Sequence, residues 1–396
     1  MVISKRAALI SPSPTLAITA KAKKMQAEGI NVIGFGAGEP DFDTPVNIKE
    51  YAKKAIDKGF TKYTPTSGTK EIKDAVCHKF KEDNGLDYSP EEVLVSCGAK
   101  HSLFNAMLAL CDDGDEVILQ SPFWVSYTEM IKLSGAKPVI LKTGRASEFK
   151  LDAAELEKAV TPRTKLVIIN SPSNPTGTVY SEQELKKLSE IIVRKKIYCV
   201  SDEIYEKIIY DGRRHVSMAS FGKEIKDLTI TVNGVSKAYS MTGWRIGYAA
   251  GPKAIIQAMS NLQDHSTSNP TSISQVASVE ALKGDQTDLE IMVKEFKKRR
   301  DYMIGKVNSI KGLSALVPGG AFYAWVDING LIGKKVENTP ISGSMALTEV
   351  LLNKAHVAVV PGGVFGDDGY IRLSYATSME NITEGLSRIE KFIEKL

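Results

Sequence analysis

The segment VNGVSKAYSMTGWRIGY, residues 232–248, places one lysine in a run of small and apolar residues. From Leu228 to Trp244, Lys237 is the only charged residue, whereas a chain that is 25% charged would carry about four charges in such a window. A desolvated lysine has a lowered pKa and becomes a nucleophile toward carbonyl groups. The alternative is a surface lysine whose stem packs while its amine stays in water. The uncharged surroundings and the position after an expected strand favour a functional lysine.

Strand-like runs alternate with helical patterns through the middle of the chain. We expect helices over residues 100–110 and 181–196, and a mostly parallel central sheet with helices on both faces, an α/β fold. From about residue 290 a long charged helix leads into a smaller α+β region. The expected strands are residues 93–97, 116–120, 138–142, 165–170, 197–201 and 228–233.

The composition excludes several classes of protein. The 396-residue chain is 43% hydrophobic, and its net charge of +4 gives no reason to expect nucleic acid or a membrane surface as a partner. No apolar run approaches the ~20 residues of a membrane span. The four scattered cysteines form no CxxC pair and are typical of thiols in a reducing compartment, so we expect a cytoplasmic location. We interpret the basic N-terminal segment as part of the mature chain, with a transit peptide as the alternative.

Unusual residues directly follow five of the expected strands. These segments are residues 98–100, Trp124, residues 171–177, Asp202 and residues 236–237. In open α/β sheets, ligands bind in the crevice past the carboxyl ends of the strands. The convergence therefore predicts one site that these five loops build together.

Three polar residues suit the ring of a cofactor. Asp202, with Tyr205 three residues later, could pair with a cationic ring nitrogen, although the same aspartate could cap a helical turn in SDEIYEKI. Asn174 lies between two prolines in SPSNPTG, where plain turn chemistry is the ordinary reason for an asparagine.

A second group of residues suits a phosphate. Gly98, Ala99 and Lys100 open a helix with free backbone N–H groups, although any tight strand-to-helix turn would look the same. Ser236 and Arg245 could add donors, and the arginine could contact two oxygens. The alternative for Arg245 is a residue on a surface strand.

Trp124 and Arg372 suit a flat, acidic ligand. Trp124 could stack on a planar ring or simply be part of the core. Arg372, in YIRLSYA, could bind a carboxylate with two hydrogen bonds or lie on an edge strand. Together these features describe a phosphorylated aromatic aldehyde with a ring nitrogen, which is pyridoxal 5′-phosphate (PLP).

The motifs around these residues resemble the class I/II aminotransferases of PLP-enzyme fold type I, and most closely the bacterial aspartate aminotransferases of the thermophile-like subgroup. The likeness runs from about Arg6 to the end of the chain. The ordered combination of SNPTG, SDEIYE and SKxxxMTGWRxGY is its most specific part. The other motifs are GAGEPDFDTP (36–45), TKYTPTSG (61–68), SCGAKHSLFN (96–105), SPFWVSY (121–127), GGAFY (319–323) and RLSYA (372–376).

The resemblance implies cofactor roles for several residues. Lys237 would form the Schiff base with PLP and later carry the proton between the substrate Cα and the cofactor. Asp202 would keep the pyridine nitrogen protonated, and Tyr205 and Asn174 would hydrogen-bond the phenolic oxygen. Trp124 would stack on the ring. The phosphate would lie among Gly98, Ala99, Lys100, Ser236 and Arg245.

The resemblance also implies substrate contacts, a partner and a division into domains. Arg372 would bind the substrate α-carboxylate, helped by Asn174, by the backbone of Gly38 and by Trp124 beside the ring. Tyr63 would reach the phosphate of a neighbouring subunit, which implies a homodimer with shared active sites. The implied domains are a large PLP-binding domain, residues 46–289, and a small domain, residues 1–45 and 290–396.

The implied reaction is a ping-pong transfer of the amino group from L-aspartate or glutamate to 2-oxoglutarate or oxaloacetate. Lys100 stands where the resembled subgroup uses a lysine for the distal carboxylate, which favours an acidic substrate. Ser11 replaces the basic residue of relatives that accept prephenate, which argues against prephenate. The alternative is an aminotransferase of aromatic or other neutral amino acids, or a β-lyase on the same fold.

Three further classes are disfavoured. GFGAGEP (34–40) lacks the final glycine of G-x-G-x-x-G, which disfavours a nucleotide-binding dehydrogenase. The five histidines form no HExxH motif or close ligand pair in the sequence, so we expect no metal. The chain carries no basic or helix-turn-helix extension, which disfavours a PLP sensor fused to a DNA-binding module.

Overall fold

A seven-stranded sheet lies at the centre of the computed structural model, which describes residues 3–10 and 14–396. The strand order is β2-β8-β7-β6-β5-β3-β4, and β8 alone of these strands runs antiparallel to its neighbours. The expected α/β class with a mostly parallel sheet is thus confirmed. The strands are β2 (Val93–Ser96), β3 (Glu116–Ser121), β4 (Lys137–Lys142), β5 (Thr164–Asn170), β6 (Tyr198–Asp202), β7 (Thr229–Gly234) and β8 (Gly247–Ala250).

All six expected strands are present, each within one residue of its expected ends. The two expected helices are confirmed as α5 (Ala99–Leu110) and α8 (Glu182–Lys195). The sequence reading missed β8, whose four residues GYAA contain none of the branched apolar residues that mark a strand. Its pairing with β2 and β7 makes it a strand in spite of its weak propensity.

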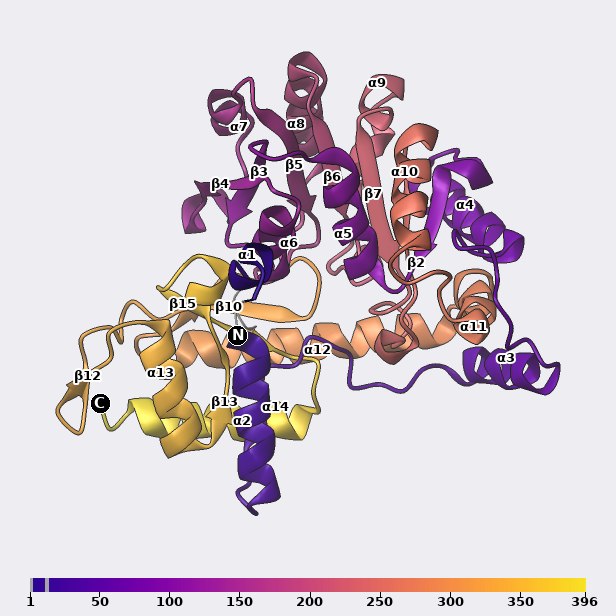
Figure 1. Ribbon diagram of the computed structural model, residues 1–396. Helices are drawn as coiled ribbons and strands as arrows, with labels where there is room; N and C mark the ends of the chain where they lie inside the picture. The colour runs from indigo at the N-terminus through magenta and orange to yellow at the C-terminus, as the bar shows by residue number, and fades with distance from the viewer. Residues whose placement is uncertain (1–2, 11–13) are drawn as a thin grey trace.

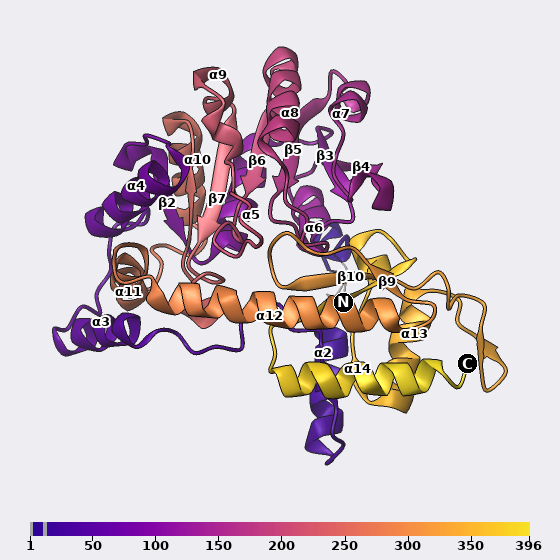
Figure 2. The ribbon, with the colours of Figure 1, turned by 180° about the vertical axis from the view of Figure 1, so that it is seen from behind.

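Helices cover both faces of this sheet (Figures 1 and 2). Along β5, Leu166 and Ile168 join one apolar core, and Val167 and Ile169 join another on the opposite face. Successive side chains of a strand point to opposite faces, so a strand buried on both sides reads as an unbroken apolar run. One face carries α5, α6 (Ser126–Leu133) and α10 (Lys253–Asp264), and the other carries α7 (Ala153–Ala159), α8 and α9 (Lys223–Lys226). The β2 end of the sheet is flanked by α3 (Val46–Asp57), α4 (Lys70–Asn84) and α11 (Ser272–Lys283).

A smaller region combines segments from both ends of the chain. Its four-stranded sheet has the order β14-β15-β10-β9. β1 (Ile33–Gly34) pairs in parallel with β13 (Val357–Ala358), which ties the N-terminal segment to the C-terminal region. The sheet strands are β9 (Ser314–Ala315), β10 (Tyr323–Asp327), β14 (Val360–Pro361) and β15 (Tyr370–Ser374), and nearby lie α2 (Pro14–Ala27), α13 (Ser344–Val350) and α14 (Met379–Ile393).

The long helix α12 (Thr287–Ser309) runs along both regions (Figures 1 and 2). It contacts β9, β10 and α14 in the smaller region, and its first turn contains the expected boundary between residues 289 and 290. The division of the chain into two domains at these residues stays a prediction. Among the described residues, no helix is both long and apolar enough to cross a membrane.

Candidate active site

Strand ends bring most of the predicted site residues to one edge of the large sheet. β6 ends at Asp202, and β5 ends at Asn170, shortly before Asn174. β7 ends at Gly234, two residues before Ser236 and three before Lys237. Parallel strands end at the same edge of a sheet, so these residues lie along one edge.

Lys237 is partly buried, and its Nζ donates a hydrogen bond to the carbonyl oxygen of Gly38 at 2.6 Å. Burial lowers the pKa of this amine to about 8; the carboxylate of Glu39 opposes the shift, while Arg245 and Arg372 reinforce it. An amine with this pKa has a larger neutral fraction at physiological pH than an ordinary lysine and is therefore a better nucleophile. The carbonyl of Gly38 thus contacts the lysine, whereas the resemblance places the Gly38 backbone at a substrate carboxylate.

Asp202 is a buried carboxylate with two hydrogen-bond donors. Its Oδ2 accepts from the hydroxyl of Tyr127 at 2.6 Å, and its Oδ1 accepts from the backbone N–H of Ile204 at 3.3 Å. Burial raises the pKa of Asp202 to about 6, and the Tyr127 hydrogen bond acts in the opposite direction. Asn170, at the end of β5, fixes the backbone at the end of β6, because its side-chain amide donates to the Asp202 carbonyl at 2.9 Å.

Arg372 lies on β15 and reaches across to the large sheet. Its guanidinium donates to Asn174 Oδ1 at 3.0 Å and to the Gly36 carbonyl at 2.9 Å, and it lies 4.4 Å from the ring centroid of Tyr323. The side chain is buried, and its Nε has no hydrogen-bond partner among the described residues. A buried guanidinium with an unused donor is suited to a carboxylate ligand.

The start of α5 and the Arg245 guanidinium together present positive charge and hydrogen-bond donors. Gly98 has φ +88°, and a Cβ at this position would lie 2.5 Å from the Arg245 guanidinium. The backbone of Arg245 has a left-handed conformation, with φ 58°. Its guanidinium donates to the carbonyls of Thr242 and Cys97 at 3.0 and 3.2 Å. A helix N-terminus with an adjacent arginine is an anion-binding arrangement.

Aromatic side chains line the remaining part of the site. Trp124 packs edge-to-face on Tyr127 at 5.3 Å, and the amine of Lys100 lies 4.9 Å from the Trp124 ring centroid. Burial, with a smaller effect of Arg245, lowers the pKa of Lys100. The Tyr205 hydroxyl lies 2.8 Å from that of Tyr323. Tyr127 and Tyr323 lie in the motifs SPFWVSY and GGAFY, but nothing in the sequence predicted the hydrogen bonds of their hydroxyls.

One predicted residue falls outside this cluster, and one is not described by the structure. Tyr63 lies between α3 and α4, far along the chain from the strand-end loops, with 91% of its side chain exposed. Ser11, on which the prediction about prephenate rests, lies outside the described residues.

The residues that the structure brings together fit PLP. Asp202 offers a buried acceptor for a ring N–H, and Lys237 offers an amine for an aldehyde. The absence of a side chain at Gly98 lets the Arg245 guanidinium lie directly against the α5 N-terminus, and the two together offer donors for a phosphate. These three features match the three functional parts of the cofactor.

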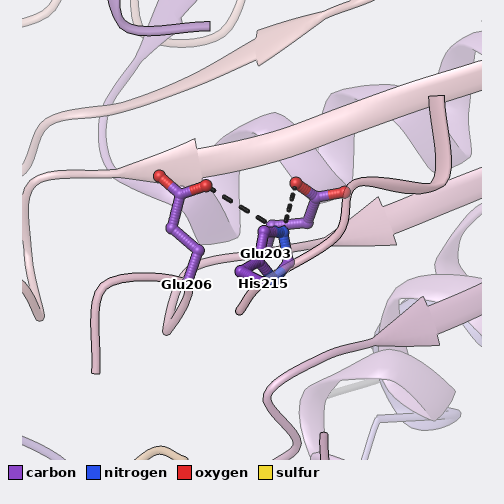
Figure 3. A group of neighbouring side chains, drawn as sticks. All are labelled: Glu203, Glu206 and His215. Carbon is purple, nitrogen blue, oxygen red and sulfur yellow. Dashed lines mark hydrogen bonds and ion pairs between the residues drawn. The ribbon is translucent and has the colours of Figure 1, made fainter. Parts of the chain in front are cut away.

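Directly after Asp202 in the chain, Glu203 forms a second polar cluster with Glu206 and His215 (Figure 3). Its donor atoms are close enough together to hold a metal ion. However, Glu203 already accepts from Ser201, Ser217, the Met218 N–H and His215 Nε2. Both oxygens of Glu206 are also occupied, by Lys79 and Asn84. We therefore interpret this cluster as an internal hydrogen-bond network, a feature that the sequence reading missed.

Comparison with known proteins leads to the same class of enzyme as the geometry of the site. The family of class I and II aminotransferases matches residues 30–389. The aspartate/prephenate aminotransferase of Nitrosomonas europaea is 48% identical over 99% of this chain and 100% of its own, and the aspartate aminotransferase of Geobacillus stearothermophilus is 48% identical over 100% and 99%. The crystal structure of an aspartate aminotransferase from Rhizobium meliloti superposes with a TM-score of 0.97 at 46% identity, covering 100% of both chains. The Thermus thermophilus aspartate aminotransferase with maleate gives 0.93 at 41% identity, covering 99% of both.

The fold and the site define a PLP-dependent enzyme of fold type I. The chain belongs to the class I and II aminotransferases and is a transaminase, as the sequence resemblance implied.

The buried pair between Lys79 and Glu206 generates a stability prediction. Burial would raise the pKa of Glu206, but the Lys79 ammonium lowers it to about 2. Lys79→Met leaves a buried carboxylate without its cation, which should cost about 3 kcal/mol of unfolding free energy in urea at pH 7. The folded pKa lies below the ordinary value of 4.5, so the wild type loses this stabilisation as pH falls from about 4.5 toward 2, and the variant should lose less.

Lys70→Met on the same helix is the matched control. Lys70 pairs with Asp74 at 2.6 Å, but its side chain is 81% exposed, so little change is expected. Equal unfolding midpoints for Lys79→Met and Lys70→Met would contradict the assigned importance of the buried pair.

Proposed function

We propose that the protein transfers the amino group of L-aspartate or glutamate to 2-oxoglutarate or oxaloacetate, with Lys237 as its central catalytic residue. The observation that carries the proposal is a partly buried Lys237 at the strand-end edge that also carries Asp202, with the Arg372 guanidinium held by Asn174 and by the Gly36 carbonyl. The names of the relatives support the acidic substrate. They do not favour the alternatives, a transaminase of neutral amino acids or a β-lyase.

When PLP is bound, it supplies an aldehyde for the substrate amine and an electron sink for the substrate Cα. Lys237 would hold the cofactor through its amine and, once freed, would move the proton from the substrate Cα. Asp202 would hold the proton on the ring nitrogen, while Tyr205 and Asn174 would hydrogen-bond the phenolic oxygen. Trp124 would pack against the ring. Gly98, Ala99, Lys100, Ser236 and Arg245 would bind the phosphate.

Arg372 and Asn174 orient the substrate. The guanidinium of Arg372 is held by Asn174 and by the Gly36 carbonyl, so its remaining donors are fixed in direction before the substrate binds. A fixed fork of donors suits the two oxygens of the α-carboxylate. Gly38, whose carbonyl accepts from Lys237, lies beside the same substrate, and its backbone helps to bind that carboxylate.

The first test is a single half-reaction. Protein loaded with PLP and mixed with L-aspartate, without an oxo acid, should lose its long-wavelength absorbance and release about one equivalent of oxaloacetate per chain. Lys237→Ala should bind PLP but release none. An absorbance change with phenylalanine and none with aspartate or glutamate would keep the family and overturn the substrate.

Lys100 is the proposed contact for the distal carboxylate. Its amine lies over the ring of Trp124, the residue that we propose packs against the cofactor ring. Its pKa is lowered by burial and by Arg245, so a second carboxylate would bind there as a counter-charge.

Lys100→Ala should therefore separate acidic from neutral substrates. Loss of a charge-assisted hydrogen bond should lower kcat/KM for aspartate by about 30-fold, and that for phenylalanine by less than about threefold. The neutral substrate serves as the internal control, because it uses every other contact of the site. Equal losses for both substrates would show that Lys100 acts on the cofactor rather than on the distal carboxylate.

We further propose a homodimer whose sites are shared. Tyr63 is 91% exposed, and apolar side chains of α3 and the following loop are exposed beside it where this helix projects from the body (Figure 1). Exposed apolar residues gathered in one segment are typical of an interface. These residues are Val46, Tyr51, Ile56 and Phe60.

Sharing of sites can be tested by complementation. Lys237→Ala and Tyr63→Ala should each be impaired as pure dimers, but a hybrid would contain one site with both native residues. Random exchange makes half of the dimers hybrid, so the mixture should regain about a quarter of wild-type activity. A monomer by light scattering, or no gain on mixing, would contradict the proposal.

The two-domain division at residues 46–289, and a cytoplasmic location, complete the proposal. All four cysteines are free thiols, which suits a reducing compartment. Limited proteolysis and cell fractionation test these two points.

A further inference from the structure

Tyr127 is a polar side chain that contacts Asp202 and has no role in the proposed mechanism. It lies in the first turn of α6, is buried, and places its hydroxyl 2.6 Å from Asp202 Oδ2. Burial and the charge of Asp202 raise the pKa of the Tyr127 hydroxyl well above its usual range. The hydroxyl is therefore protonated and donates to the carboxylate.

This hydrogen bond is the shorter of the two that the Asp202 carboxylate accepts. The carboxylate receives only one other described hydrogen bond, the longer one from the Ile204 N–H at 3.3 Å. The charged and titratable groups around it are Glu203 on its own segment, Lys237 after β7, Tyr205 in the next turn and Tyr127 on α6. Of these, Tyr127 alone donates a side-chain hydrogen bond to the carboxylate.

Tyr127 also touches the residue proposed to stack on the ring. Its ring meets that of Trp124 edge-to-face, with 5.3 Å between centroids and 86° between planes. α6 therefore supports two cofactor contacts at once: Trp124 by packing and Asp202 by hydrogen bonding. A shift of Tyr127 would disturb both.

We propose that Tyr127 is a positioning residue that orients the Asp202 carboxylate and keeps it ionised opposite the ring nitrogen of PLP. This inference rests on the proposed role of Asp202. Without the Tyr127 hydroxyl, the carboxylate becomes more basic and draws the proton away from the ring nitrogen. Lys237 then faces less positive charge. Its nitrogen should therefore keep its proton more readily and lose it at a higher pH.

Tyr127→Phe removes only the hydroxyl and tests the inference. The pH midpoint of the visible absorbance of the PLP-loaded protein should rise by about 0.5 unit, and the Kd for PLP should increase about tenfold. Tyr210→Phe is the matched control, because Tyr210 is equally buried and donates its hydroxyl to the Ala321 carbonyl at 2.5 Å. This control should lose similar stability with an unchanged midpoint.

A second variant keeps the test decisive if Tyr127→Phe folds poorly. Site-specific 3-fluorotyrosine at residue 127 retains the shape but donates a stronger hydrogen bond, so the midpoint should move to lower pH. A packing role alone would leave the midpoint in place for both variants. Unchanged midpoints in folded Tyr127→Phe and fluorotyrosine proteins would overturn the inference.

Asp202→Ala separates this inference from the proposed function. If Asp202→Ala shifts the midpoint and weakens PLP binding while Tyr127→Phe does neither, only the role of Tyr127 fails. If Asp202→Ala itself leaves both quantities unchanged, the proposed role of Asp202 fails, and the inference about Tyr127 fails with it.

Discussion

A carboxylate held out of water at the end of a central strand is the constraint on which this site depends. Burying an ionised group costs several kcal/mol unless hydrogen bonds or an opposite charge replace its hydration. Asp202 has two hydrogen bonds, and burial still raises its pKa to about 6. The free chain thus holds an acid that is incompletely stabilised, and a cationic ring N–H would supply what is missing. Burial also disfavours the charged form of Lys237 and lowers its pKa to about 8.

The scaffold meets this constraint by joining segments from distant parts of the sequence. A Cβ at Gly247 would lie 2.0 Å from the Ala99 N, so the absence of a side chain on β8 lets the start of α5 pack against the sheet. From the other region, Arg372 on β15 reaches Asn174, while Gly38 reaches Lys237. The site is therefore complete only when the smaller sheet and the N-terminal segment lie against the large sheet.

The sequence predicted those parts of the structure that local chemistry determines. Strands β2 to β7 are apolar runs with turn residues at their ends, and the residues past those ends converged as expected. β8 was missed because its pairing is set by neighbouring strands rather than by its own residues. Tyr127 and Tyr323 were missed for a related reason: a tyrosine in an apolar motif reads as core, and its hydroxyl partner is visible only in three dimensions.

Asp202 and Glu203 show how one dipeptide can serve two purposes. Successive side chains at a strand end point to opposite sides, so one carboxylate faces the site and the other faces the interior. Glu203 accepts from four donors and is fully satisfied, whereas Asp202 accepts from two. The Glu203 network fixes the backbone at residue 203, and within the same turn the Asp202 carboxylate accepts only the 3.3 Å hydrogen bond from the Ile204 N–H. The Asp202 carboxylate thereby stays available for a ligand, and its direction depends on the hydroxyl of Tyr127.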